Sequence, residues 1–398
     1  MAGITGIVAE FNPFHSGHAA LIRAAVQGGS DGVVAVMSGN YVQRGSPAIT
    51  DKRVRAKAAL LCGVDLVLEL PLAYATAPAQ RFARGAISLL AATGRVDTLT
   101  FGSECGDLST LQALAAAVED KAVVAEMKRL LAGGMTFARA RELAVAGGTG
   151  PVLAAALAAP NNLLGVEYLR AAATIGWQPR VTTLRRQGAA HDSSDPRDGF
   201  ASGSFLRQHA GDFALLCRYL PEQAALVLAD ALAAGLYPAD PSRLETAILA
   251  HLRRLGPDEL KRLPDLSEGL ENRLLAVIRT APTLEELESA LKTKRYTMAR
   301  VRRLILSAFL GLTREDSHLP IPYIRVLGFT PRGKEILSEM KGSCKLPVST
   351  SLARLRSLGG GCERFAALEE TSTDLYALCL RQPVPCGYEY SASAVYFK

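Results

Sequence analysis

The stretch Gly6–Ala25, GIVAEFNPFHSGHAALIRAA, contains the strand, the turn and the helix start from which the fold can be argued. Its first five residues, Gly6–Glu10, form an apolar run long enough for one buried strand. Asn12 and Pro13 interrupt this run, and Ser16 predicts the start of a helix. A strand that enters a helix through a tight turn brings backbone N–H groups and the positive end of a helix dipole to one place. The stretch therefore predicts a phosphate site.

Two histidines lie on this turn, His15 and His18, with only Ser16 and Gly17 between them. Gly17 has no Cβ, so a ligand can approach the backbone closely there. Imidazole N–H groups at such a place would stabilise charge that develops on phosphate oxygens. Histidines near a turn are also common as ordinary solvated residues, so the pair alone leaves both interpretations open.

Apolar runs and helical patterns alternate through the first hundred residues. The runs predict strands at 6–10, 32–37, 66–70 and 98–101, and the helical patterns lie at 18–26, 49–62 and 80–92. This alternation predicts an α/β fold, a Rossmann-like doubly wound parallel sheet with helices on both faces. Ligands bind such sheets beyond the carboxyl ends of the strands, which is where the two histidines fall. Neither GxxxxGK[ST] nor GxGxxG follows the first strand, which disfavours a P-loop kinase and a dinucleotide dehydrogenase.

A later strand and a later helix start add cations to the candidate site. The β-branched segment 181–184 is typical of a strand, and it ends at Arg185 and Arg186. Further along, Ser204 lies in a Ser/Gly-rich helix start and Arg207 follows one turn later. This arrangement fits a second anion site, although a plain helix cap explains the same pattern.

Most of the remaining chain has helical periodicity. Asn161 or Asn162 is a natural N-cap for a helix predicted at 163–173. After residue 211 the strand signals thin out, and helices are predicted at 213–236, 241–255, 265–279, 284–291 and 297–312, before strand-like character returns at 323–329. We therefore predict two domains, a sheet domain at 1–210 that carries the ligand site and a mainly helical, basic domain at 211–398.

The segment KTKRYTMARVRR at 292–303 is dense in cations and contains no acid. With a tyrosine among them, these cations suit a phosphate backbone and a stacked base. The candidate nucleic-acid contacts are Lys292, Lys294, Arg295, Tyr296, Arg300, Arg302 and Arg303. A solvated helix face is the usual alternative for a run of charges, and the missing acids favour nucleic acid over that alternative.

Composition is that of a folded protein. The 398 residues are 49% hydrophobic and 21% charged, and Lys plus Arg exceeds Asp plus Glu by 45 to 38, which fits an anionic partner without demanding one. The seven cysteines include no CxxC pair, which argues against a zinc knuckle and a secreted disulfide framework. The N-terminus lacks a signal-peptide pattern and the apolar segments are too short to span a bilayer, so we expect a cytoplasmic protein without a membrane partner.

Several stretches, taken together, fit one known family. They are IVAEFNPFHSGH (7–18), VMSGNYVQRGSPA (36–48), DLVLELP (65–71), QRFARGAISLL (80–90), LTFGSE (99–104), PNNLLGVEYL (160–169) and RRQGAAHDS (185–193), with KRYTMARVRRL and YIRVLGF in the C-terminal part. Over most of its length the chain resembles the bacterial tRNA(Met) cytidine acetate ligases, and its HxGH element resembles that of the nucleotidyltransferase superfamily, which includes the class I aminoacyl-tRNA synthetases. The chain departs from the family near 186–207, where Ala190 precedes His-Asp in place of a tyrosine and SGSFLR replaces a SATAIR-like helix start.

The resemblance implies a ligase that works in two steps. Acetate attacks the α-phosphate of ATP to give acetyl-adenylate and pyrophosphate, and the wobble cytidine of elongator tRNA(Met) then takes the acetyl group to become N4-acetylcytidine. Residues 1–210 would be the ATP-binding catalytic domain and 211–398 the tRNA-binding domain, with no further protein partner. Mg²⁺ is expected with ATP, although no carboxylate cluster marks its ligands.

The resemblance also implies a set of site residues. The catalytic pair would be His15 and His18. The ATP contacts would be Ile7, Val8, Ala9, Glu10, Phe11, Asn12, Pro13, Phe14, His15, Ser16, Gly17, His18, Ala19, Ala20, Gly102, Asn162, Arg185 and Arg186, with Ser204 and Arg207 as further phosphate contacts.

Two other functions share part of this pattern. A metabolic nucleotidyltransferase that adenylates a small phosphate compound would keep the HxGH site and have no need of the basic helices. A non-catalytic RNA-binding protein would keep the nucleotide pocket without turnover. Salt-dependent tRNA binding separates the first alternative from the ligase, and turnover separates the second.

Overall fold

The computed structural model describes residues 3–186, 199–266, 269–294 and 296–397. The strands in these residues are β1 Gly3–Ala9, β2 Ser30–Ser38, β3 Tyr41–Val42, β4 Ser46–Pro47, β5 Leu66–Leu70, β6 Val96–Ser103, β7 Arg180–Arg185, β8 Ile324–Phe329, β9 Val348–Ser349 and β10 Val395–Tyr396. All except β3 and β4 form one sheet, in the order β10-β8-β5-β2-β1-β6-β7 with β9 beside β8. Every pair in this sheet is parallel except β5 with β8. The predicted doubly wound α/β sheet is therefore confirmed, with one antiparallel pair that was not predicted.

Helices cover both faces of this sheet. One face shares a hydrophobic core with α1 Ser16–Gln27, α2 Lys52–Leu61 and α12 Glu222–Ala233. The other face shares a core with α3 Leu72–Ala75, α4 Ala79–Ala92, α9 Pro160–Thr174, α17 Met298–Leu310 and α20 Gly360–Ala377. In β2, Val33 and Ala35 point into the first core while Val34 and Val36 point into the second, as the pleat of a strand requires. Burial on both faces explains why this strand is a continuous apolar run in the sequence.

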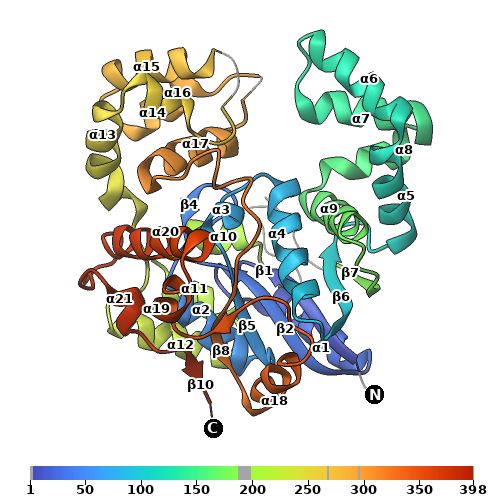
Figure 1. The fold of residues 1–398 in the computed structure, drawn as a ribbon, viewed down its shortest axis with the longest axis vertical. Coiled ribbons are helices and arrows are strands. Elements are labelled where there is room, and N and C mark those ends of the chain that lie inside the picture. The colour runs from blue at the N-terminus through green and yellow to red at the C-terminus, as the bar shows by residue number, and fades with distance from the viewer. Residues whose placement is uncertain (1–2, 187–198, 267–268, 295, 398) are drawn as a thin grey trace.

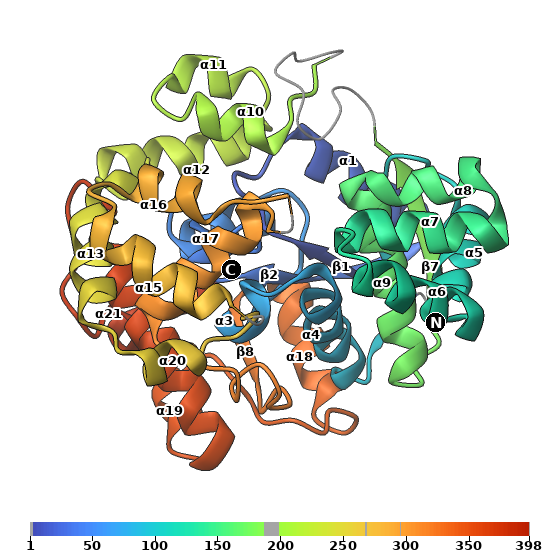
Figure 2. The same ribbon diagram turned by 90° about the horizontal axis from the view of Figure 1, so that it is seen from above.

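Two separate groups of helices extend above the sheet (Figures 1 and 2). The first group is α5 Leu108–Glu119, α6 Lys121–Ala132, α7 Phe137–Thr149 and α8 Pro151–Ala155, followed by the short η1 Ala156–Ala158. The second is η2 Pro241–Leu244, α13 Glu245–Arg254, α14 Pro257–Lys261, α15 Leu270–Thr280 and α16 Leu284–Leu291, which leads into α17. In Figure 1 both groups lie above the sheet, and in Figure 2 they flank it.

The remaining helices are short or follow the late strands. They are α10 Gly203–Gln208, α11 Phe213–Cys217, α18 Pro331–Met340, α19 Leu352–Arg356 and α21 Tyr388–Ser391. In the described part of the chain no single helix has the length and apolar character to cross a membrane, while the pair 151–158 and 160–174, bent by 99°, passes that test together.

The predicted division at residues 210 and 211 does not separate the sheet from the helices. Strands β8, β9 and β10 all come from beyond residue 320, and β8 pairs directly with β5. Helix α20, near the end of the chain, packs in the same core as α4. The C-terminal tail thus completes the N-terminal sheet, and the part of 211–398 without strands of this sheet ends before β8.

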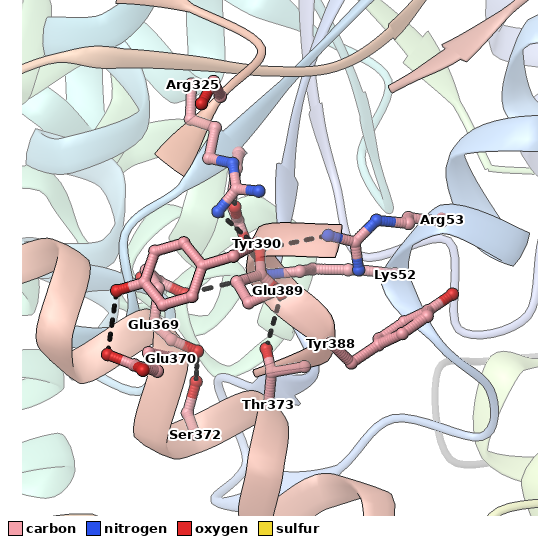
Figure 3. A network of polar contacts seen from close by, with 12 residues as sticks. Lys52, Arg53, Arg325, Glu369, Glu370, Ser372, Thr373, Tyr388, Glu389 and Tyr390 are labelled. Carbon is pink, nitrogen blue, oxygen red and sulfur yellow. Dashed lines mark hydrogen bonds and ion pairs between the residues drawn. The ribbon is translucent and has the colours of Figure 1, made fainter. Parts of the chain in front are cut away.

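A buried cluster of charges joins these distant segments (Figure 3). Its cations are Lys52, Arg53 and Arg325, and its carboxylates are Glu69, Glu369 and Glu389. The ammonium group of Lys52 lies 2.5 Å from Oε1 of Glu69 and 3.0 Å from Oε1 of Glu389. Helix α2, strands β5 and β8, and helices α20 and α21 each supply at least one member, so the cluster ties the first hundred residues to the last forty.

Candidate active site

A cavity of about 380 Å³ opens at the carboxyl ends of β1, β6 and β7. Its size falls within the usual range for a small-molecule site, roughly 300–1,000 Å³. The loop after β1, helix α1, the start of α9 and the start of α10 complete its walls. The cavity therefore lies where a doubly wound sheet places its ligands.

His15 and His18 stand at the start of α1 and form a reciprocal cap. The Nδ1 atom of His15 accepts the N–H of Gly17 at 3.1 Å, and the Nδ1 atom of His18 accepts the N–H of His15 at 3.2 Å. The two rings stack with their centroids 3.8 Å apart. A Cβ on Gly17 would lie 2.9 Å from the His15 ring, so glycine at this position leaves room for the ring. Helix α1 begins at Ser16, as predicted, and His15 is its N-cap.

These hydrogen bonds determine which ring nitrogen carries the proton in the neutral form of each imidazole. Because each Nδ1 atom accepts a backbone N–H, the ring proton of the neutral form is on Nε2. Burial, then the neighbouring His15 and then Arg186, hold the pKa of His18 well below its usual value of 6.5. His18 is therefore a neutral ring whose Nε2 is a hydrogen-bond donor.

The loop between β1 and α1 is held from behind by Arg55 of α2. Its guanidinium donates to the carbonyl oxygens of Glu10 at 2.6 Å, Ser38 at 3.1 Å and Thr50 at 3.1 Å, and also to that of Gly39. The side chain is 1% exposed. Four carbonyl acceptors satisfy this buried charge and join the ends of β1 and β2.

Asn12 is fixed within the same loop. Its Oδ1 atom accepts the N–H of Ile49 at 2.7 Å, and its carbonyl accepts from Arg207 at 2.9 Å. Phe11, just before it, has φ of +46°, a conformation that non-glycine residues rarely adopt. The neighbouring hydrogen bonds hold this conformation, so the path of the turn is set by residues outside it.

The opposite wall is formed by β6, β7 and α9. Gly102 gives space to Arg186, whose Cγ would lie 3.4 Å from a Cβ at that position. The carboxylate of Glu104 accepts the backbone N–H groups of Asn161 at 3.2 Å and Asn162 at 2.8 Å. Neither asparagine is the N-cap that was predicted, because α9 begins at Pro160 and Glu104 caps it from another loop.

Most of the predicted site residues come together here. The cavity is lined by Val8, Ala9, Glu10, Phe11, Asn12, His15, Gly17, His18, Ala20, Gly102, Arg185, Arg186, Ser204 and Arg207. The structure places the others outside its walls: Ile7, Pro13, Phe14, Ser16, Ala19 and Asn162. Ile7, Phe14 and Ala19 are core residues. Asn162 is 3% exposed, and its Oδ1 atom accepts the N–H of Cys105 while Asn161 faces the cavity.

Sequence reasoning missed several lining residues. Gln43 and Arg44, on the β3–β4 hairpin, form part of the wall, as do Leu164 and Tyr168 of α9 and Arg23 of α1. Leu164 and Tyr168 lie within the helix predicted at 163–173 but were not proposed as ligand contacts. The position of Gln43 and Arg44 after the second strand was a usable signal, since it is also a carboxyl end of the sheet.

The basic segment before and within α17 lies next to this hairpin, and two of its five described cations, Arg300 and Arg303, point inward. Arg303 is 12% exposed in its side chain, donates to the Gln43 carbonyl at 3.4 Å and pairs with Asp265 at 3.8 Å. Arg300 donates to the Asp265 carbonyl at 2.7 Å and lies over the Tyr296 ring, which is itself 8% exposed. The expected stacking of a base on Tyr296 does not fit this burial, and the acid that these two arginines contact, Asp265, comes from the loop between α14 and α15.

Three cations of the segment remain on the surface. Lys292 and Lys294 are exposed, and Arg302, 47% exposed in its side chain, pairs with Glu288 at 3.0 Å. Arg295 lies outside the described residues. Among the described residues, the exposed nucleic-acid candidates are therefore Lys292, Lys294 and Arg302, while Arg295 stays a prediction.

No metal site stands out in the part of the chain that the structure describes. There, no group of three or more His, Cys, Asp or Glu side chains converges in a way that could hold a metal ion. The donors that line the cavity are mainly cations and amides, which suits the phosphates of a nucleotide.

Comparisons with known proteins agree with this geometry. The chain matches a family model described as HIGH Nucleotidyl Transferase over residues 2–387. It is 37% identical to the tRNA(Met) cytidine acetate ligase of Syntrophomonas wolfei, over 98% of this chain and 99% of the relative. It is 35% identical to the protein of the same name from a Thermoanaerobacter species, over 98% of each chain.

Solved structures give the same result. The fold matches Thermotoga maritima TmcAL in its apo form with a TM-score of 0.94 and 31% identity, over 99% of both chains. It also matches that protein bound to alpha-thio ATP with a TM-score of 0.91 and 30% identity, again over 99% of both chains.

Proposed function

This chain belongs to the HIGH nucleotidyl transferase family and, within it, to the tRNA(Met) cytidine acetate ligases, and from that premise we propose how its own residues carry the reaction. The proposed product is N4-acetylcytidine at the wobble position of elongator tRNA(Met), made from ATP and acetate through acetyl-adenylate. The observation that carries the proposal is the paired-histidine turn at the mouth of the cavity, on a chain that matches a TmcAL structure holding an ATP analogue.

The triphosphate would lie against the start of α1. The Nε2–H donors of His15 and His18 and the backbone N–H groups of the first helical turn offer positive charge there. Arg185, Arg186 and Arg207 line the same cavity and suit the outer phosphates. These donors are held in place before the nucleotide arrives, which is the arrangement that stabilises charge most effectively as pyrophosphate leaves.

The first chemical step needs little beyond positioning. An acetate oxygen attacks the α-phosphorus, the bond to the bridging oxygen breaks, and pyrophosphate leaves with the electron pair. A carboxylate nucleophile requires no base, so the neutral, donating ring of His18 is suited to this step. Mg²⁺ would accompany ATP on its phosphates, since the described residues offer it no cluster of carboxylates.

The tRNA would approach along the β3–β4 hairpin and α17. Arg44 lines the cavity and is exposed, and Arg303 of α17 contacts the neighbouring Gln43 carbonyl. The exposed cations Lys292, Lys294 and Arg302 would continue this path for the phosphate backbone. We expect the protein to act in the cytoplasm, without a membrane or protein partner.

The test of this function separates its two steps. Purified full-length protein is incubated with ATP and acetate, with and without transcribed elongator tRNA(Met). We expect acetate-dependent pyrophosphate release in both cases, and N4-acetylcytidine in digests of the tRNA only when all three substrates are present. Pyrophosphate release that does not depend on acetate but does depend on a small phosphate compound would favour a metabolic nucleotidyltransferase instead. tRNA binding without any turnover would favour a non-catalytic RNA-binding protein.

A further inference from the structure

Glu10 is the one carboxylate among the described residues that line the cavity. It follows β1 directly and is anchored twice. Its Oε1 atom accepts the N–H of Gln43 at 2.9 Å, and its backbone carbonyl accepts from Arg55 at 2.6 Å. Burial and then the nearby Glu10 carboxylate raise the pKa of Tyr168, which places that carboxylate close to the α9 wall. Glu10 therefore has a defined position between the hairpin and α9.

The second step of the proposed function needs a proton acceptor, which the first step does not. The N4 amine of cytidine is a weak nucleophile, because its lone pair is conjugated with the ring. When it attacks the acetyl carbonyl it becomes acidic and must lose a proton for the amide to form. A base positioned in the site typically contributes about 10²–10⁴-fold to such a step.

The other described side chains of the cavity wall are poor proton acceptors. The Nδ1 atoms of His15 and His18 already accept backbone N–H groups, so the remaining ring nitrogen of each carries a proton in the neutral form. The arginines are permanently protonated, and the amides of Gln27, Gln43 and Asn161 are not basic. Among the side chains of such a wall, a carboxylate is the ordinary proton acceptor.

We propose that Glu10 is the catalytic base for acetyl transfer to the tRNA, an inference that rests on the proposed function. The N4 lone pair forms the C–N bond to the acetyl carbon, and the C–O bond to the adenylate phosphate breaks with its electron pair retained by AMP. The N4 proton passes to the Glu10 carboxylate and from there to solvent. Glu10, which the family resemblance implies only as an ATP contact, thus acts on the tRNA.

The experiment measures the two steps separately in the Glu10→Gln variant of the full chain. The amide keeps an acceptor oxygen for the Gln43 N–H but cannot take up a proton at neutral pH. Adenylation is followed as acetate-dependent ATP–pyrophosphate exchange, and transfer as single-turnover acetylation of tRNA from preformed acetyl-adenylate. We expect the ratio of the transfer rate to the adenylation rate to fall about 100-fold. Glu335→Gln, a surface carboxylate on α18, is the matched control and should leave this ratio unchanged.

Each outcome decides the proposal. A transfer rate equal to that of the parent, or an equal loss in both steps, would overturn it, because the second result places Glu10 in nucleotide binding. If the parent protein itself makes no acetyl-adenylate, the proposed function fails, which is a different result from a failure at Glu10.

Two further variants distinguish a base from a purely structural acceptor. Glu10→Asp retains a carboxylate and should keep a higher ratio of transfer rate to adenylation rate than Glu10→Gln. Glu10→Ala leaves space for a small base, and formate added to the reaction started from acetyl-adenylate, without ATP, should raise its transfer rate at least several-fold. Absence of both effects would assign Glu10 a positioning role and contradict the proposal.

Discussion

His18 shows how a single residue adapts to its role. Burial, His15 and Arg186 keep its ring neutral, and the neutral ring is the form that accepts the His15 N–H through Nδ1. Protonation would remove that acceptor and place a cation beside Arg186. The same effects that make His18 a defined donor on Nε2 also make the turn sensitive to acid.

Stability should therefore depend on pH through His18. Its pKa is lower in the folded than in the unfolded chain, so below about pH 6.5 the unfolded state binds a proton that the folded state does not. Folding stability from this residue is unaffected above that pH and falls as the pH drops, by at most about 1.4 kcal/mol per pH unit. His18→Gln keeps an acceptor at the same helix position and does not titrate.

Urea unfolding of both proteins at pH 7.5 and 5.5 checks this prediction. The parent should lose more stability on acidification than His18→Gln, since the histidines outside the His15–His18 pair contribute equally to both. Equal losses would show that His18 titrates normally.

The histidine pair should also matter for the first chemical step and not for tRNA binding. Replacing either His15 or His18 with alanine removes one donor aimed at developing charge, which typically costs about 100-fold or more in rate. We expect that loss in acetate-dependent pyrophosphate release, with tRNA affinity in a filter-binding assay unchanged. His251→Ala, in the helical group far from the cavity, is the control and should retain full activity.

At the scale of elements, α2 supports the site from behind. Arg55→Met would leave four backbone carbonyls without their donor, at about 1–3 kcal/mol for a buried acceptor that loses its partner. We expect a loss of unfolding free energy of about 3 kcal/mol or more and a higher KM for ATP, because the Glu10 carbonyl is one of the four.

A neighbour on the same helix provides the control. Lys57 makes an exposed pair with Asp230 at 3.3 Å, so Lys57→Met should change stability by less than about 1 kcal/mol. Urea unfolding and ATP kinetics of both variants test the assignment. A normal KM for ATP in a folded Arg55→Met protein would show that α2 does not position the loop.

Among the described cations of the basic segment, the three exposed ones should bind nucleic acid. Changing Lys292, Lys294 and Arg302 together to glutamine should weaken tRNA binding and make the slope of log K against log salt shallower by about 2–3, since each lost phosphate contact reduces it by about 0.7–0.9. Adenylation should persist, because these residues lie outside the cavity wall.

A second triple variant carries the same change in charge elsewhere. Lys334, Lys341 and Lys345 are exposed on and after α18, at the opposite end of the molecule in Figure 1. Their replacement by glutamine should leave the salt slope unchanged. Equal effects of the two triples would mean that tRNA responds to net charge and not to this surface.

At the scale of the whole molecule, the buried charge cluster closes the fold. Burial alone would raise the pKa of Glu389, but Lys52, Arg325 and Arg53 outweigh it and hold that pKa well below its usual range. The stability that this carboxylate contributes is present above its unfolded pKa of about 4.3 and is lost only as the pH falls toward its lower folded value. At neutral pH these ion pairs therefore hold α21 against α2 and β8.

Glu389→Gln should destabilise the whole protein and not just its tail. Removing one partner of a buried ionic cluster leaves uncompensated charge, which costs about 3–5 kcal/mol. We expect a single cooperative unfolding transition at lower urea concentration, followed by circular dichroism. Glu335 is itself exposed on the surface of α18, where it pairs with Arg332, so Glu335→Gln should cost less than about 1 kcal/mol. A separate early transition in the variant would show that the C-terminal segment folds independently.

The sequence by itself determined the alternation of strands and helices, the turn that carries His15 and His18, and the family. These features depend on neighbours a few residues apart: period-two and period-3.6 patterns, an Asn-Pro break and glycine between two histidines. The predicted strand at 66–70 agrees with β5, residue for residue, for this reason.

Only the tertiary structure decided what distant residues do to one another. It assigned Asn161 to the cavity and Asn162 to a loop, turned Arg300 and Arg303 inward, and brought β8 beside β5. Whether a charge faces solvent or a buried partner depends on chain segments up to hundreds of residues away, such as Lys52 and Glu389. Local periodicity does not predict those partners, because they come into contact only when the core excludes water and the sheet sets their positions.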